Sequence, residues 1–134
     1  MTINTTVIYA IRILGYMCEK KNCLVRAKEL VKETGISEQY CFKVMNIIRH
    51  AGLVESEQGC RGGFRMAQDP CKVSLYDVVC VFEKQDSWEE KCGQDERMIG
   101  LVREIQKREK AFLKSITIRD IYIDGKAIEK PDGL

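Results

Sequence analysis

Residues 35–67 read GISEQYCFKVMNIIRHAGLVESEQGCRGGFRMA and contain two structural signals in succession. Ser37 is a helix N-cap candidate, and Gly52 is placed to end the helix that begins there. At the helical spacing of about 100° per residue, apolar side chains share one arc of this helix and polar side chains share the opposite arc. Phe42 is the only large apolar residue on the polar arc. The pattern predicts an amphipathic helix with an outward polar flank.

A β-hairpin is predicted directly after this helix. Residues 53–56 and 64–67 have the short alternating pattern of strands, and the glycine-rich run 58–63 supplies the turn. Glycines let a backbone approach another molecule closely, and Arg61 lies among them. An arginine at this position can bridge phosphates or enter a minor groove of DNA. No Gly-Lys-Ser/Thr follows the run, so it is not a nucleotide-binding P-loop.

Helices are also predicted on both sides of this region. Residues 5–19 and 26–34 have helical periodicity, and Gly35 is placed to end the second of these helices. Two short helices joined by a tight glycine turn and followed by a hairpin are typical of a winged helix-turn-helix. Ser74 can cap a further helix through residue 82, and residues 95–114 form a longer, charged helix. The predicted fold class is mainly α with a small β-hairpin, a winged helix-turn-helix plus a long helix.

A recognition helix buries one face and offers hydrogen-bonding groups to base edges in the major groove. The helix after Ser37 has this division, although many amphipathic helices carry polar residues for solubility alone. The hairpin with its arginine favours the interpretation as a DNA-binding unit. The predicted DNA-contacting residues are Ser37, Gln39, Tyr40, Phe42, Lys43, Asn46, Arg49, Arg61, Gly62, Gly63 and Arg65.

Length and composition fit one soluble domain with an extension. The chain has 134 residues, of which 45% are hydrophobic and 31% charged, enough to bury a core. Its net charge of +2 neither establishes nor excludes binding to nucleic acid. No apolar run approaches the roughly 18 residues of a membrane span, and the N-terminus lacks the pattern of a signal peptide. We therefore expect a cytoplasmic protein without a membrane partner.

Several runs of the sequence resemble the IscR/NsrR/CymR family of winged-helix regulators. They are YAIR at 9–12, GISEQY at 35–40, AGLVES at 51–56, GCRGGFRMA at 59–67, VSLYDV at 73–78 and SITIRDI at 115–121. The resemblance covers about residues 3–121. It implies a homodimeric transcription regulator whose long helix crosses onto a partner protomer. The apolar stripe of that helix has few other elements to bury it, and its predicted dimerisation residues are Met98, Leu101, Val102, Ile105 and Phe112.

The sequence departs from this family at three places. Basic residues usually precede the segment at Tyr9, where this chain has Thr6, Val7 and Ile8. A common wing arginine is replaced by Gln58, so Arg61 is expected to compensate. Phe42 stands where the iron–sulfur member has a glutamate, which predicts a different base preference that includes contact with a thymine methyl.

The seven cysteines are odd in number and include no CxxC pair, which predicts neither a disulfide framework nor a zinc site. Family members that bind an iron–sulfur cluster use three closely spaced cysteines before the long helix, and only Cys92 matches. We therefore expect no cofactor, with an atypical cluster shared with the partner chain as the alternative. Cys92 and Cys60 are the sensor candidates because both are expected to be accessible thiols. Cys18, Cys41 and Cys80 lie on apolar faces and are expected in the core.

The sequence predicts four segments. They are a winged helix-turn-helix domain at 1–83, a sensor-type loop at 84–94, a dimerisation helix with its closing segment at 95–121, and a tail at 122–134. The predicted function is a dimeric repressor that reads a palindromic operator and is modulated by an effector or by thiol chemistry near Cys92. Its expected partners are double-stranded DNA, a second copy of the chain, and a small-molecule effector or a partner protein. No catalytic constellation accompanies the single histidine, His50, so an enzyme is not expected. The near-neutral charge leaves open a protein-interaction module that does not bind DNA.

Overall fold

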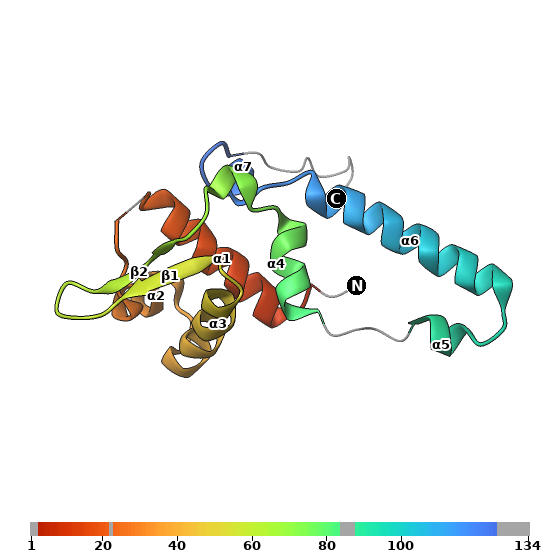
Figure 1. Cartoon of the computed structure of the whole chain (residues 1–134), viewed down its shortest axis with the longest axis horizontal. Helices are drawn as coiled ribbons and strands as arrows, with labels where there is room; N and C mark the ends of the chain where they lie inside the picture. Colours follow the sequence, from red (N-terminus) through yellow and green to blue (C-terminus); the bar gives the residue numbers. More distant parts are fainter. Residues whose placement is uncertain (1–2, 22, 84–87, 126–134) are drawn as a thin grey trace, which may run out of the picture.

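The computed structural model describes residues 3–21, 23–83 and 88–125 (Figure 1). Helices dominate, and the only sheet among these residues is one antiparallel hairpin. This confirms the predicted fold class. The elements are α1 (Thr5–Glu19), α2 (Ala27–Thr34), α3 (Glu38–His50), β1 (Val54–Glu57), β2 (Gly63–Met66), the 3-10 turn η1 (Pro70–Lys72), α4 (Leu75–Phe82), α5 (Trp88–Cys92), α6 (Glu96–Lys114) and α7 (Ile118–Tyr122).

Local capping explains where the helices begin and end. The side chain of Asn4 accepts a hydrogen bond from the backbone N–H of Val7 at the start of α1. Ser37 caps α3 in the same way, as predicted. Ser74 and Asp77 form a reciprocal capping box at the start of α4. Gly35 ends α2 with a φ of 72°, in the left-handed region that glycine adopts without strain.

The main core forms around α1, which contacts α2, α3, α4, α7 and β2. The side chains of Ile13 and Leu14 in α1, Leu30 in α2 and Ile48 in α3 are fully buried in one cluster. The hairpin is tied to this cluster because Val25 exchanges two backbone hydrogen bonds with Phe64, at 2.7 and 2.8 Å. The wing is therefore held against the residues that lead into α2.

The long helix α6 extends away from the rest of the chain, with α5 beside its far end (Figure 1). Only its last turns meet α4, where Leu113 packs with Val7 and Val79. The predicted irregular loop before α6 is wrong in part, since residues 88–92 are helical and Glu89 pairs with Arg103 at 3.1 Å. Residues 84–87 of the predicted sensor loop, and residues 126–134 of the predicted tail, lie outside the described residues.

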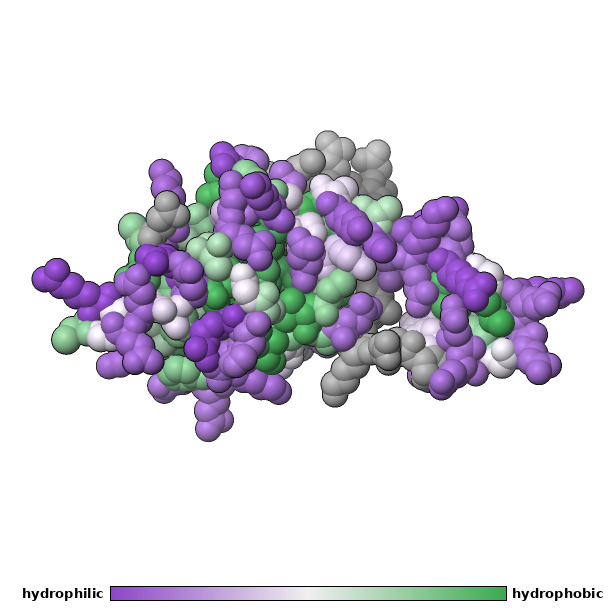
Figure 2. Space-filling model, in the orientation of Figure 1, coloured by the Kyte–Doolittle hydropathy of each residue, from purple (hydrophilic) through white to green (hydrophobic). Residues whose placement is uncertain are grey.

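One side of α6 carries a stripe of exposed apolar side chains. They are Met98, Leu101, Ile105 and Phe112, with exposed fractions of 44%, 53%, 39% and 52%. Val102 differs from the prediction, because it is only 3% exposed within the single chain. Val102 follows Leu101 in the sequence and lies to the side of the exposed stripe. It precedes Arg103, which forms an ion pair with Glu89 of α5. Figure 2 shows mostly hydrophilic surface on this part of the molecule, with apolar surface between the charged side chains. Among the described residues, no helix combines the length and the apolar character needed to cross a membrane.

Candidate nucleic-acid interface

The two faces of α3 differ as the sequence predicts. Cys41, Val44, Met45 and Ile48 are buried, and Gln39, Phe42, Lys43, Asn46 and Arg49 are exposed on the other side. The wing tip projects from the end of the molecule that is furthest from α5 (Figure 1). A cavity of about 350 Å³ lies where the two elements meet, lined by Asn46 and Arg49 of α3 and by residues 56–59 and 62–64 of the hairpin. The exposed flank of the helix and the wing therefore border one groove.

Phe42 occupies the centre of this surface. Its side chain is 47% exposed and lines the groove beside the wing. It also lines a second cavity of about 490 Å³, whose other walls include Lys28 and Lys32 of α2. A single exposed apolar side chain is common on protein surfaces, so the position of Phe42 between the two cavities, rather than its exposure, makes it a candidate contact. Sequence reasoning missed Lys28 and Lys32, although their position on the first helix of a helix-turn-helix, next to the recognition helix, was the available signal.

Within the α3 flank, Arg49 donates a hydrogen bond to the side-chain oxygen of Asn46 at 3.3 Å. His50 lies within 2.7 Å of the backbone oxygen of Asn46, at the C-terminal end of the helix. The side chains of Asn46 and Arg49 are exposed, so the amide of Asn46 and the guanidinium of Arg49 remain open to a ligand. Asn and Arg are the side chains that most often read adenine and guanine in pairs of hydrogen bonds.

Tyr40 and Ser37, both predicted DNA contacts, also have structural roles, of which the sequence indicated only the N-cap role of Ser37. The Tyr40 hydroxyl lies 2.6 Å from the Thr6 hydroxyl oxygen, and its ring meets the ring of Tyr9 edge-on at 5.1 Å. The ammonium of Lys43 lies 5.6 Å from the centre of the Tyr40 ring. Tyr40 therefore orients α3 against α1, whereas Ser37 caps the helix.

Two of the wing glycines are required by the hairpin itself. A Cβ on Gly62 would lie 2.2 Å from the carbonyl oxygen of Glu57, and a Cβ on Gly63 would lie 2.8 Å from the carbonyl oxygen of Val25. Gly59 has a φ of +106° and open space around it. The glycine run thus has an internal cause, and close approach to another molecule is not needed to explain Gly62 and Gly63.

The two wing arginines are in different environments. Arg65 forms ion pairs with Glu55 at 2.6 Å and with Glu57 at 2.9 Å, and the hydrogen bond to Glu55 is the main reason that its pKa is raised. These two carboxylates already engage the guanidinium that the sequence assigns to DNA contact. Arg61 is exposed, and no hydrogen bond or ion pair engages its side chain among the described residues. Arg26 donates a hydrogen bond to the backbone oxygen of Cys60, which holds the tip toward α2.

The predicted thiol sites are only partly accessible. Cys60 is exposed at the wing tip, but Cys92 is half-buried at the end of α5 and not in an open loop. Cys80 is exposed, so its assignment to the core is wrong, because it lies on the side of α4 that faces away from the buried Val78 and Val79. Cys18 and Cys41 are buried as predicted, and burial raises the pKa of both thiols.

Comparison with known proteins identifies regulators of transcription. Residues 3–124 match the family model described as "Rrf2: Iron-dependent Transcriptional regulator". A protein of Aquifex aeolicus (strain VF5), whose name places it among HTH-type transcriptional regulators, is 29% identical over 90% of this chain and 91% of its own length. The HTH-type transcriptional regulator IscR of Vibrio cholerae is 26% identical over 78% of this chain and 64% of its own length. The solved structure of T. potens IscR superposes with a TM-score of 0.74 at 24% identity, covering 99% of this chain and 94% of that one, which shows the same fold.

The family description includes iron, which proteins bind through clusters of thiolate, imidazole or carboxylate side chains. Within residues 3–21, 23–83 and 88–125, no group of three or more His, Cys, Asp or Glu side chains is arranged to hold a metal ion. A cluster of the usual kind takes four protein ligands, mostly thiolates, and Cys92 is the only cysteine in the sequence after Cys80. The donor set of one protomer therefore does not fit a typical iron–sulfur site.

Proposed function

The chain belongs to the Rrf2 family of transcriptional regulators, and from this membership we propose that it is a homodimeric repressor of the cytoplasm that reads a palindromic operator with α3 and the wing. The observation that carries this proposal is the groove shared by the exposed flank of α3 and the hairpin. It joins base-reading side chains to cations on one surface. We assign DNA binding to the predicted domain 1–83, whose first three helices and wing share one buried core with α4 and α7.

Base recognition is assigned to the outward flank of α3. Asn46 and Arg49 lie one turn apart and match the hydrogen-bonding edges of adenine and guanine. Phe42 lies one turn before Asn46, where its exposed ring suits the methyl group of thymine. Gln39 extends this row toward the start of the helix. The half-site is therefore expected to include thymine next to a purine read by Asn46.

Phosphate contacts are assigned to the cations around this row. Lys43 lies on α3, Lys28 and Lys32 lie on α2, and Arg61 lies at the wing tip. Each such contact releases condensed counterions, so affinity falls as salt concentration rises. Arg65 contributes little because Glu55 and Glu57 already neutralise it.

Dimerisation is assigned to the exposed stripe of α6. Met98, Leu101, Ile105 and Phe112 recur on one side of the helix and are exposed in the single chain. A second copy that covers them places two recognition helices on one duplex, about one helical turn apart. A ligand or thiol modification near Cys92 then changes the spacing of these helices by moving α6, because α5 and α6 are in contact.

The test begins with selection of the operator from a random duplex library by the full chain, followed by fluorescence anisotropy on the selected site. Arg61→Ala is expected to weaken binding about tenfold and to reduce the slope of affinity against salt by about one phosphate. Arg65→Ala is the matched control on the same hairpin and is expected to change affinity less than about twofold. Cys92→Ser is expected to abolish any response to an effector while leaving basal affinity unchanged.

Two outcomes would contradict the proposal. Failure to select any sequence at low salt would favour the protein-interaction module. Equal losses from Arg61→Ala and Arg65→Ala would show that the wing tip is not a separate contact. Phe42→Glu sharpens the result, since it is expected to lose the preference for thymine while it keeps the salt dependence.

A further inference from the structure

A separate cavity of about 630 Å³ lies on the body away from the α3 groove. It is bounded by the end of α1, the chain that leaves β2, η1 and α7. Its walls combine the apolar side chains of Met66 and Pro70 with the charged groups of Lys21, Asp69 and Arg119. Cavities of this size, mostly apolar with a few charged groups, are typical of small-molecule sites.

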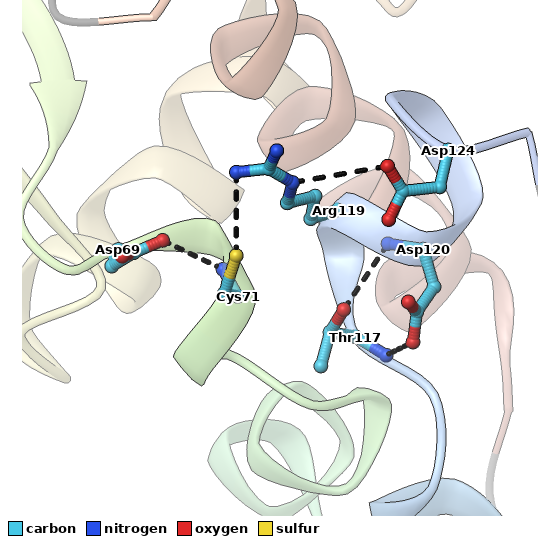
Figure 3. A network of polar contacts seen from close by, with 6 residues as sticks. All are labelled: Asp69, Cys71, Thr117, Arg119, Asp120 and Asp124. Carbon is cyan, nitrogen blue, oxygen red and sulfur yellow. Dashed lines mark hydrogen bonds and ion pairs between the residues drawn. The ribbon is translucent and has the colours of Figure 1, made fainter.

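Arg119 connects this cavity to an exposed thiol (Figure 3). The guanidinium Nη1 donates a hydrogen bond to the sulfur of Cys71 at 3.5 Å, and its Nε lies 3.9 Å from a carboxylate oxygen of Asp124. The backbone N–H of Cys71 donates to Asp69 at 2.9 Å. The hydrogen bond with Cys71 is the first cause of the raised pKa of Arg119, and that from the Cys71 backbone is the first cause of the lowered pKa of Asp69.

The position of Arg119 is fixed by the fold. Thr117 and Asp120 form a capping box at the start of α7, so the first turn of this helix is held firmly. The side chain of Arg119 reaches from that turn toward η1, where Cys71 lies (Figure 3). The guanidinium is therefore held beside the sulfur by two short helical elements that contact each other.

Cys71 lies beside the cavity, in contact with Arg119 of its wall, and another thiol, Cys18, lines the cavity itself. Cys18 of α1 is only 4% exposed. Burial raises the pKa of Cys18, so this thiol stays protonated at neutral pH, whereas Cys71 is exposed. The exposed sulfur of Cys71 is thus placed next to the cavity by its hydrogen bond from Arg119, whereas the buried sulfur of Cys18 forms part of the wall.

From this arrangement we propose that the cavity binds a small disulfide bearing carboxylate and ammonium groups and that Cys71 forms a mixed disulfide with it. Arg119 and Lys21 suit the carboxylates of such a molecule, and Asp69 suits its ammonium group. Cys71 differs from Cys80, which is also exposed, because a guanidinium donates a hydrogen bond to its sulfur.

The reaction balances without a further oxidant. Cys71 loses its proton to water, and its thiolate attacks one sulfur of the disulfide. A new sulfur–sulfur bond forms, the original one breaks, and the departing thiolate takes up a proton. Cys71 is oxidised and half of the small disulfide is reduced. Arg119 donates to the attacking sulfur throughout and so acts as a positioning residue.

The experiment incubates the fully reduced chain with glutathione disulfide and follows each cysteine by peptide mass spectrometry. Cys71 is expected to gain one glutathionyl group first, at a rate that saturates with disulfide concentration because binding precedes reaction. Arg119→Gln is expected to slow this step about tenfold, whereas Arg119→Lys restores part of the rate. Cys80→Ser, the control on another exposed thiol, leaves the Cys71 rate unchanged.

Three results would overturn the proposal. One is modification of Cys23, Cys60 or Cys80 at the Cys71 rate, and another is an unaltered rate in Arg119→Gln. The third is a rate that rises linearly with disulfide while hydrogen peroxide oxidises Cys71 selectively, which would show a reactive thiol without a binding site. No DNA is present in this assay, so its outcome is independent of the proposed repressor function.

Discussion

The body of the molecule, formed by α1 to α4, the hairpin, η1 and α7, buries most of its apolar residues within one chain. The arm, formed by α5 and α6, leaves most of its own exposed. Ile13, Leu14 and Ile48 are fully covered in the body, whereas in α6 only Val102 and Leu113 are buried. Both regions carry apolar residues at helical spacing. Helical periodicity therefore identifies an apolar face in each region. It does not identify the segment that packs against this face, which can belong to the same chain or to a second one.

The largest expected effect separates the two regions by their dependence on protein concentration. Leu14→Ala removes a fully buried side chain and is expected to lower the free energy of unfolding by about 2–5 kcal/mol at every concentration. Leu101→Ala is expected to lower stability only where the dimer is populated, because its side chain is 53% exposed in one chain. Urea unfolding across a protein dilution series measures both. Parallel losses at all concentrations would contradict the division into body and arm.

The next effect tests what covers the arm. Leu101→Asp places a carboxylate in the proposed dimer contact, where burial without a partner costs about 3 kcal/mol, or roughly a hundredfold in the dimer dissociation constant. Lys107→Asp is the control, because its position lies on the opposite side of α6 and is exposed. Sedimentation velocity is expected to show monomer for the first variant and dimer for the second. Dimers of both would place the interface elsewhere.

A pair of glycines tests packing density in each region. A Cβ on Gly15 of α1 would lie 2.3 Å from the ring of Tyr122, whereas nothing lies within 4 Å of a Cβ on Gly100 of α6. Gly15→Ala is expected to destabilise the body by about 1–3 kcal/mol through overpacking. Gly100→Ala is expected to stabilise the arm by about 0.5–1 kcal/mol, since alanine favours a helix interior. Thermal unfolding is expected to show a lower midpoint for Gly15→Ala and a higher midpoint for Gly100→Ala. Destabilisation by Gly100→Ala would mean that a second chain approaches that site closely.

The sequence predicts the body better than the arm for a physical reason. Caps such as Ser37 and Ser74 are local, so the ends of α3 and α4 follow from a few neighbouring residues. The helix α5 has no comparable signal in its five residues, and the burial of Val102 depends on what lies beside α6. Neither was predictable from the period of the pattern alone.

The candidate site shows the same limit of local patterns. The exposed flank of α3 follows from its period, and its members are placed as predicted. The pairing of Arg65 arises from strand register, which sets Arg65 directly opposite Glu55. The predicted hairpin did not by itself specify this register. The reason for Gly62 is a contact with the carbonyl oxygen of Glu57 across the turn. Such contacts become visible only when the turn geometry is known.

The smallest expected effect is a pH dependence of the body. Burial raises the pKa of the Cys18 and Cys41 thiols above their ordinary value of 9.0, so the folded state holds their protons longer than the unfolded state does. Stability from these thiols is complete below that value and is lost as pH rises through it, by at most about 1.4 kcal/mol per pH unit for each thiol. Urea unfolding between about pH 8 and pH 10 is expected to show a shallower decline in Cys41→Ala than in the parent chain. Cys60→Ala, at an exposed position, should keep the parent slope, and a slope unchanged by Cys41→Ala would mean that the buried thiols of the body do not cause the alkaline loss.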